Sequence, residues 1–137
     1  MVSNSNPNCF FVVPQKAEIK KGNRFLIVKR EPGAHTHPNC WDFPGGRLEN
    51  GETPEAGLKR EVKEETNLTI KVLKPSFVFT EKFKDHYAQF VVYKCRLVSG
   101  KLRLSREHTE ARWATKEKIL KLKTEKFLRE YLKAGKA

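Results

Sequence analysis

Short apolar runs alternate with polar, turn-forming segments along this chain, and each run has the length of one strand or helix. Apolar residues at 10–13 predict a short strand. The run 24–30, which follows a turn at 21–23, predicts a buried strand. Residues 31–39 contain two prolines and a glycine, which indicates a loop, and residues 41–43 form a brief extended piece.

The second half of the chain continues the same pattern with longer runs. Residues 69–80 and 86–98 are rich in β-formers, and the short polar segment between them predicts a long hairpin. Residues 111–113 predict a further strand, followed by a short helix that begins after Thr115. The last helix begins after Thr124, and its apolar residues recur at helical spacing: Phe127, Leu128, Tyr131 and Leu132.

The clearest helix signals lie between residues 46 and 68. Thr53 is a good N-cap, and Pro54 suits the first helical position because its missing N–H has no helical partner there. The helix is predicted to continue to residue 65 or 66. Asn67 follows, and asparagine accepts the left-handed conformation that commonly ends helices.

Three glutamates share one face of this predicted helix. Glu61, Glu64 and Glu65 stand at i, i+3 and i+4, so their carboxylates repel one another, and Arg60 offsets part of that repulsion. Gly57 leaves room on the same face for a ligand. Grouped hard oxygens suit Mg²⁺ or Mn²⁺. A solvated, charge-rich helix face explains the same spacing, and spacing alone leaves both interpretations open.

Composition places the chain among folded single-domain proteins. With 137 residues, 38% apolar and 10% aromatic, it can bury a core without disulfide or metal support. No apolar run approaches the roughly 20 residues of a membrane span, and none forms a signal-peptide core. Three scattered cysteines, Cys9, Cys40 and Cys95, make no disulfide framework, which favours the reducing cytoplasm.

The charge balance is strongly basic. Subtracting 16 Asp and Glu from 28 Lys and Arg gives a net charge of +12. Such a field attracts polyanions, including nucleotides, pyrophosphates and nucleic acids. A surface that is charged only for solubility is the alternative, and charge alone does not separate the two.

Read as one pattern, the central segment resembles the Nudix box, Gly-x5-Glu-x7-Arg-Glu-U-x-Glu-Glu-x-Gly-U, where U is aliphatic. Gly46, Glu52 and the run 60–68 supply all but one of its fixed positions. The departure is Asn67, where the family has glycine. The preceding residues 41–46, Trp-Asp-Phe-Pro-Gly-Gly, also look like the usual approach to the box.

The resemblance implies an α/β (α+β) fold, a Nudix-type α/β/α sandwich with a mixed β-sheet and a loop–helix–loop catalytic motif. It is compatible with the elements predicted above. We therefore expect a single Nudix hydrolase domain over residues 1–137, with residues 1–8 frayed at the end of the chain.

The resemblance also implies a reaction: hydrolysis of a pyrophosphate bond in a nucleoside diphosphate linked to another group, by water activated by Mg²⁺ or Mn²⁺. Arg60 would orient Glu61, and Glu52 and Asn67 would be structural parts of the motif. Either Glu61 or Glu64 would accept the proton from water. The expected metal ligands all offer oxygen atoms: the Gly46 carbonyl, Glu61, Glu64 and Glu65.

Three further candidates lie outside the box or at its edge. Glu110 precedes the last predicted strand, where relatives often carry a glutamate that binds metal or acts as the base; an ordinary surface residue is the alternative. Arg47 and Arg30 are candidate substrate-binding residues because both are expected near the same cleft. A plain exposed arginine explains each of them as well.

Two other groups of residues have a functional and a simpler explanation. Phe83, His86 and Tyr87 surround the predicted hairpin turn, where they could stack on a base or simply pack. The loop 35–40 contains two histidines and a cysteine, but no fourth ligand for zinc is placed by the sequence. We interpret it as a loop with incidental imidazoles.

Two functions from different classes remain. The favoured one is a Mg²⁺-dependent nucleotide pyrophosphohydrolase with a small nucleotide as its partner, because the glutamate set is intact. The alternatives are a non-catalytic nucleotide- or RNA-binding Nudix module, which the charge would suit, and a hydrolase of capped RNA. The substrate and the oligomeric state do not follow from the sequence, and no membrane partner is expected.

Overall fold

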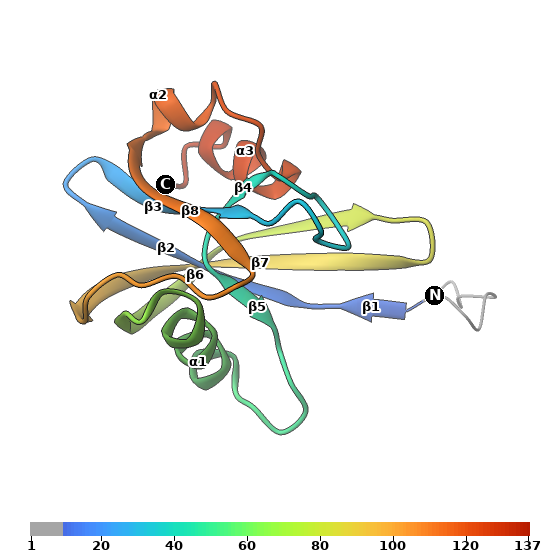
Figure 1. Ribbon diagram of the computed structural model, residues 1–137. Coiled ribbons are helices and arrows are strands. Elements are labelled where there is room, and N and C mark those ends of the chain that lie inside the picture. The colour runs from blue at the N-terminus through green and yellow to red at the C-terminus, as the bar shows by residue number, and fades with distance from the viewer. Residues whose placement is uncertain (1–9) are drawn as a thin grey trace.

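The computed structural model describes residues 10–137, so the expectation for residues 1–8 lies outside it. The elements follow in the order β1 (Phe10–Val12), β2 (Pro14–Lys21), β3 (Arg24–Arg30), β4 (Trp41–Asp42), β5 (Gly45–Arg47), α1 (Pro54–Thr66), β6 (Thr69–Lys82), β7 (His86–Ser99), β8 (His108–Thr115), α2 (Lys116–Ile119) and α3 (Lys126–Lys133). One sheet runs through the molecule, with α1 on one side and α2 and α3 on the other (Figure 1). The predicted α/β/α sandwich is confirmed.

The sheet is mixed, as expected. Its main path is β1-β7-β2-β3-β4, with β6 added to β7, β8 to β3 and β5 to β2. Strand β7 runs parallel to β1 and β2, and the other pairs are antiparallel. Strands β2 and β7 are therefore interior strands, whereas β6 pairs only with β7 among residues 10–137.

The long hairpin is confirmed as β6 and β7, which are joined by residues 83–85. The strand predicted at 24–30 is β3, and the loop predicted after it contains no helix or strand up to residue 40. The piece predicted at 111–113 is only the middle of β8, which begins three residues earlier, at His108.

Strand β2 was not predicted, because its alternation of apolar with charged residues resembles an exposed segment. Lys16 and Glu18 of this strand are nevertheless buried, since distant parts of the chain supply their partners. The Nζ of Lys16 lies 2.7 Å from Asp42, and Glu18 accepts a hydrogen bond from the hydroxyl of Tyr131. A charged strand can occupy the interior of a sheet where such partners are present.

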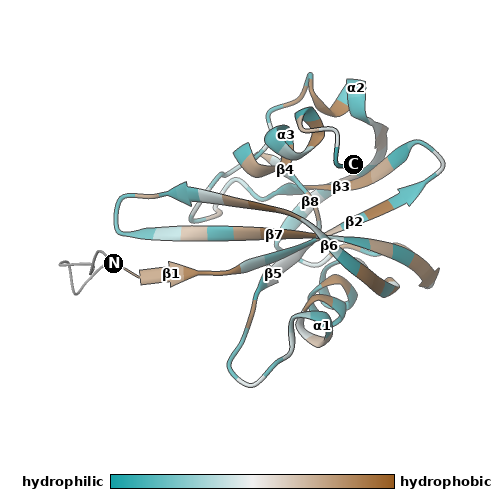
Figure 2. Cartoon of the chain, turned by 180° about the vertical axis from the view of Figure 1, so that it is seen from behind, coloured by the Kyte–Doolittle hydropathy of each residue, from teal (hydrophilic) through white to brown (hydrophobic). Residues whose placement is uncertain are grey.

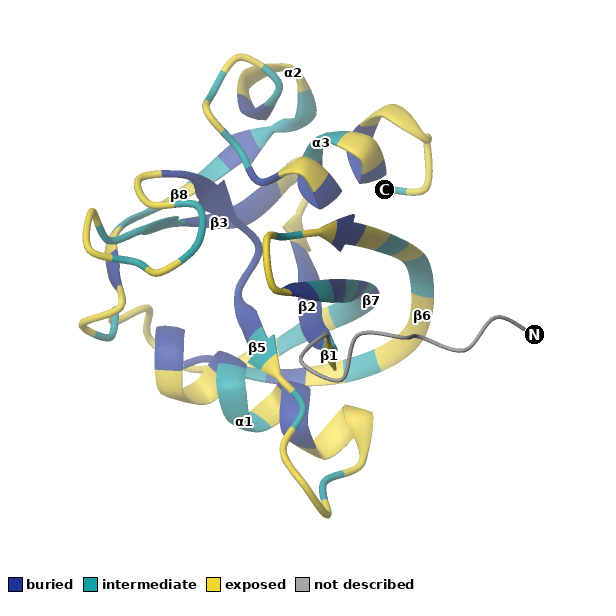
Figure 3. Cartoon of the chain, turned by 90° about the vertical axis from the view of Figure 1, so that its right-hand side faces the viewer, coloured by how far each residue is buried: buried dark blue, intermediate teal, exposed yellow. Residues whose placement is uncertain are grey.

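Two hydrophobic cores hold the layers together. Leu58 and Val62 of α1 pack on one face of the sheet, and the aromatic-rich face of α3 packs on the other. Both helices contain buried residues, drawn dark blue in Figure 3, and hydrophobic stretches of β6 and β7 meet at the centre of the sheet (Figure 2). None of the helices among the described residues is long and apolar enough to cross a membrane.

Helix α1 begins and ends where the sequence predicted. The side chain of Thr53 accepts a hydrogen bond of 3.2 Å from the N–H of Ala56, and Pro54 opens the helix. Asn67 adopts the left-handed conformation, with φ of 65°, and its N–H donates to the carbonyl of Lys63. Asparagine thus ends this helix in the way glycine usually does.

Candidate active site

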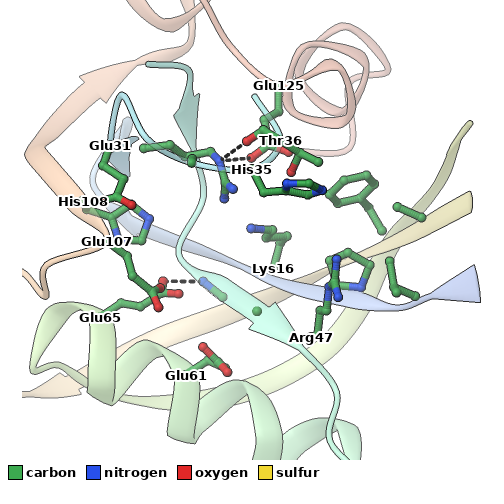
Figure 4. A pocket seen from close by; sticks show the side chains of 18 of the residues that line it. Lys16, Glu31, His35, Thr36, Arg47, Glu61, Glu65, Glu107, His108 and Glu125 are labelled. Atoms are coloured by element: carbon green, nitrogen blue, oxygen red, sulfur yellow. Dashed lines mark hydrogen bonds and ion pairs between the residues drawn. The ribbon is translucent and has the colours of Figure 1, made fainter. Parts of the chain in front are cut away.

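A pocket of about 450 Å³ lies at the end of the sheet where α1, the loop after β3 and the start of α3 approach one another (Figure 4). Its walls belong to both layers of the sandwich. Carboxylates of α1 and of the loop before β8 lie on one side, and cations of β2, β3 and β5 lie beside them. The pocket therefore brings both signs of charge together.

The carboxylate side is formed by Glu61 and Glu65 of α1 and by Glu107. The N–H of Gly45 donates a hydrogen bond of 3.0 Å to Oε1 of Glu65, which fixes that side chain against β5. A Cβ atom on Gly46 would lie 2.5 Å from the carboxyl carbon of Glu61. Glycine at position 46 therefore leaves the space that the carboxyl of Glu61 occupies.

The two helix carboxyls are disfavoured as anions in the protein alone. Burial raises the pKa of Glu65 to about 8, although Lys16 and the N–H of Gly45 act in the opposite direction. Burial also raises the pKa of Glu61, and Arg60 opposes that shift. A cation placed between these carboxyls would stabilise their ionised forms.

The donor chemistry fits a hard divalent cation. Glu61 and Glu65 offer carboxylate oxygens to the same pocket. Mg²⁺ is commonly held by one or two carboxylates together with water and substrate phosphates, so two protein carboxylates suffice. Within residues 10–137, no three His, Cys, Asp or Glu side chains are already gathered around a metal-sized space.

Three cations line the pocket. Arg47 is exposed, and Arg30 is held by a hydrogen bond of 2.9 Å from its Nε to the carbonyl of Thr36. Both residues were predicted to bind substrate, and the structure places both at the pocket. Lys16 was not predicted, because β2 itself was missed; its side chain is 5% exposed and points into the pocket (Figure 4).

A buried group of charges lies behind these cations. Burial lowers the pKa of Lys16, but the attraction of Asp42 and Glu125 outweighs it and leaves the pKa raised. Burial raises the pKa of Asp42, but Lys16, Glu125 and Arg30 together outweigh it and leave the pKa lowered. Burial and the neighbouring Asp42 raise the pKa of Glu125 well above its usual range.

The carboxyl of Glu125 lines the pocket, where its Oε2 lies 3.9 Å from Nε of Arg30 and has no hydrogen-bond partner among residues 10–137. His108 lines the pocket as well, and burial lowers its pKa to about 4, so its imidazole is neutral. Sequence reasoning found neither residue. The only signal for Glu125 was its position at the start of the last helix.

Aromatic rings form the wall nearest the hairpin turn. Phe83 and His86 line the pocket and stack on each other, with ring centroids 4.8 Å apart. Phe10 stacks on His86 at 5.2 Å. Tyr87, the third residue proposed for base stacking, pairs instead with Phe11 and does not line the pocket.

Comparison with known proteins identifies the family. Residues 11–134 match the NUDIX domain, which is most of the chain. The chain belongs to the Nudix family. A MutT-like protein of Streptomyces ambofaciens is 32% identical over 74% of the chain, and an ADP-ribose pyrophosphatase of Methanocaldococcus jannaschii is 30% identical over 84%. These matches span 61% and 69% of the two relatives.

Solved structures confirm that the fold is Nudix-like. The crystal structure of a MutT protein from Methanosarcina mazei Go1 superposes with a TM-score of 0.85. It is 26% identical, and the alignment covers 96% of this chain and 95% of that one. The mixed sheet between helices thus extends the resemblance from the Nudix box to the described domain.

The arginine of the Nudix box joins the box loop to the helix. The guanidinium of Arg60 donates hydrogen bonds of 2.6 and 2.9 Å to Glu52, and others of 3.1 Å to Glu61 and 3.2 Å to Glu64. Glu52 also accepts the N–H of Glu49 at 3.1 Å. These contacts are the ones that the Nudix resemblance implies for a residue that orients Glu61 and a residue that holds the loop.

Two of the predicted metal ligands, Glu64 and Glu110, lie outside the pocket. The side chain of Glu64 is 59% exposed and contacts Arg60. Glu110 lies on β8 opposite Lys29, where it pairs with Arg112 at 2.9 Å. Because β8 begins earlier than predicted, Glu107 lines the pocket in place of Glu110.

The histidine-rich loop of this Nudix chain makes no metal centre within the described residues. His37 lies 3.2 Å from Glu81, and Cys40 is a buried free thiol. His35 lines the pocket. The loop thus borders the pocket, and two of its side chains contribute to packing and pairing.

Proposed function

We propose that this Nudix protein is a Mg²⁺-dependent pyrophosphohydrolase. Its substrate would be a nucleoside diphosphate linked to another group. One observation carries the proposal: Glu61 and Glu65 share a pocket with Lys16, Arg30 and Arg47. Carboxylates can hold the metal while the cations bind the phosphates that the metal does not reach.

The residues divide the chemistry between them. Mg²⁺, when bound, would neutralise phosphate oxygens and lower the pKa of a water molecule. Glu61 and Glu65, with the Gly46 carbonyl, would hold the metal. Of the two candidate proton acceptors, Glu61 lines the pocket and Glu64 does not, which favours Glu61.

The opposite wall suits a nucleoside. Phe83 and His86 offer stacked rings at the pocket, which could bind the face of a base. Oε2 of Glu125, which has no hydrogen-bond partner among the described residues, could bind the edge of that base. The relative named ADP-ribose pyrophosphatase makes ADP-ribose a substrate to test first. Free thiols at Cys40 and Cys95 are consistent with the cytoplasm as the site of action.

The test is a screen of the purified protein with Mg²⁺ or Mn²⁺. The screen would compare nucleoside triphosphates (oxidised ones included), ADP-ribose, dinucleoside polyphosphates and capped RNA. We expect turnover of at least one of these compounds, loss of turnover in excess chelator, and recovery with metal. No turnover of any compound, or full turnover in chelator, would contradict the proposal.

A further inference from the structure

Five basic residues lie together on the sheet, at the end of the β6–β7 hairpin that is remote from the pocket. We call this group the cationic face: Lys20 of β2, Lys71 and Lys74 of β6, and Lys94 and Arg96 of β7. Phe83, at the other end of the hairpin, lines the pocket. Phe83 lies twelve positions beyond Lys71 along the chain, which is about 40 Å at the usual rise per strand residue.

Strand register places these cations directly opposite one another. Lys71 pairs with Arg96 and Lys74 pairs with Lys94 across the antiparallel β6–β7 ladder. Like charges in directly opposed positions destabilise a sheet, because their Cβ atoms are only about 5 Å apart. An anion bound beside two such pairs would offset the repulsion between their like charges.

The five side chains lie on the same side of the sheet. Lys94 reaches Glu18 at 3.6 Å, and Glu18 contacts α3, which places Lys94 on the α3 side. The Nζ of Lys20 lies 4.9 Å from the ring of Phe25, in the core under α3. The alternate residues of β6 and β7 pack in the core under α1: Ile70, Val72, Cys95 and Leu97.

Little negative charge compensates this group. Glu18 is 4% exposed, and its carboxylate already accepts the hydroxyl of Tyr131 and pairs with Lys94. Of the five cations, only Lys94 pairs with a carboxylate among the described residues. Lys20, Lys71, Lys74 and Arg96 are exposed.

Protection of a sheet edge explains only part of the group. Lysines on an edge strand prevent pairing with another sheet, and β6 is such a strand. Lys71 and Lys74 therefore have a structural explanation. Arg96 of β7 and Lys20 of β2 lie on interior strands, whose hydrogen bonds are already satisfied by neighbours. Edge protection gives no reason for a cation at these two positions.

We propose that the cationic face binds the phosphate backbone of a nucleic acid, an interaction beyond the proposed hydrolysis. The backbone positions that carry its cations are about 4.8 Å apart across strands and about 7 Å apart along them, on a rigid sheet. Fixed rows of cations suit a nucleic acid, because its covalent backbone holds the phosphates at regular intervals. The five residues include no aromatic ring to stack on bases, so binding is independent of sequence.

The decisive variant is Arg96→Glu. It replaces a like-charge pair with an opposite-charge pair beside Lys71, so the variant folds with an equal or higher melting temperature. A matched control is Lys121→Glu, an exposed residue after α2 that gives the same change in net charge. Lys121 follows α2, which contacts β8, whereas Arg96 lies on β7.

Binding would be measured by fluorescence anisotropy in chelator, at about 50 mM salt. The probes are an RNA of about 20 nucleotides, a DNA duplex of about 20 base pairs and phosphatidylserine vesicles. We expect Arg96→Glu to weaken nucleic-acid binding at least about 10-fold and to lower the salt slope by about one, with Lys121→Glu near wild type. The relative affinities of the wild-type protein for RNA and DNA identify the preferred nucleic acid.

Three results would overturn the proposal. The first is a wild-type protein that binds neither nucleic acid at low salt. The second is an equal loss in Arg96→Glu and Lys121→Glu, which would assign binding to net charge alone. The third is vesicle binding that depends on Arg96 while nucleic-acid binding does not, which would identify a lipid surface. Turnover of the small substrate should be unchanged in both variants, because neither residue lines the pocket.

Discussion

At the scale of single residues, Glu65 combines burial with a charge that the protein alone disfavours. It is 5% exposed, has a pKa of about 8 and accepts the N–H of Gly45. Glutamine at this position keeps the accepting oxygen and the size of the side chain. Only the ability to become an anion is lost, and that ability is what a divalent cation requires.

The first prediction follows for Glu65→Gln. We expect kcat to fall at least about 10²-fold, the scale for loss of a metal ligand. The melting temperature without metal should be unchanged or slightly higher, and the rise on adding Mg²⁺ should disappear. Glu55→Gln, an exposed change in the same helix, is the control. Equal Mg²⁺-induced shifts in wild type and Glu65→Gln would show that Glu65 binds no metal.

Gly46 supports a second prediction. Alanine at this position would place a Cβ 2.5 Å from the carboxyl of Glu61, so that side chain must move. We expect Gly46→Ala to lower kcat at least about 10-fold, with little loss of stability, because a side chain and not the backbone is displaced. Gly33→Ala meets only Glu31, at 3.8 Å, and should be neutral. Wild-type kcat in Gly46→Ala would show that the position of the Glu61 carboxyl seen here is not needed for turnover.

The thiols give a third prediction. Burial raises the pKa of Cys95 from 9.0 to about 12, so at pH 8 its reactive thiolate is about 10³-fold rarer than in an unfolded chain. Cys40 is buried and its pKa is also raised. Alkylation of both sites, followed by mass spectrometry, should be slow in the folded protein and fast in denaturant. Equal rates at Cys95 in the two conditions would contradict its burial.

At the scale of elements, the sequence predicts best what is decided locally. Helix α1 carries its own cap at Thr53 and its own stop at Asn67, so both ends were found. Strand β2 was missed because Lys16 and Glu18 find their partners 26 and 113 residues away. Charged residues in a local pattern predict an exposed segment. Long-range partners allow these residues to be buried, and such partners cannot be identified from the local pattern.

The same distinction explains the site. Glu61 and Glu65 follow from helical spacing, which fixes their common face. Glu110 was preferred to Glu107 because the start of β8 was placed three residues late, and strand ends depend on pairing with β3. Glu125 joins the pocket only through the packing of α3. The box could thus be predicted from the sequence, whereas the opposite wall could not.

The buried pair that joins β2 to β4 supports a fourth prediction. Asp42→Asn leaves the Lys16 ammonium buried without its anion, and Asp42 is fully buried. We expect unfolding in urea to show a loss of about 3 kcal/mol. The double variant Lys16→Met/Asp42→Leu removes both charges and should recover most of that loss. A single variant as stable as the wild type would show that the ion pair does not stabilise the sheet.

At the scale of the whole molecule, the two ends of one sheet carry surfaces with different charge. Its pocket end combines carboxylates with Lys16, Arg30 and Arg47, whereas the far end of the hairpin carries the cationic face. Neither grouping is visible in the net charge of +12, which sums over both. Strand register was needed to separate them, because it decides which lysines and arginines share a surface.

The last prediction concerns how this charge acts on a small phosphorylated substrate. An excess of 12 positive charges attracts the substrate from solution, and screening removes the attraction once the Debye length falls to about 10 Å, near 0.1 M salt. We therefore expect kcat/KM to fall as salt rises through this range, measured with Mg²⁺ held saturating. The value of kcat should change little, because steering acts before the complex forms.

Two variants locate the origin of the steering. Arg47→Gln removes an exposed cation from the pocket and should flatten the salt profile, whereas Arg96→Gln removes the same charge from the far end and should leave it nearly unchanged. Added viscogen would first establish that association limits kcat/KM. If it does and the wild-type profile is still flat, the charge does not steer the substrate. An equal change in both variants would instead assign the effect to the field of the whole molecule.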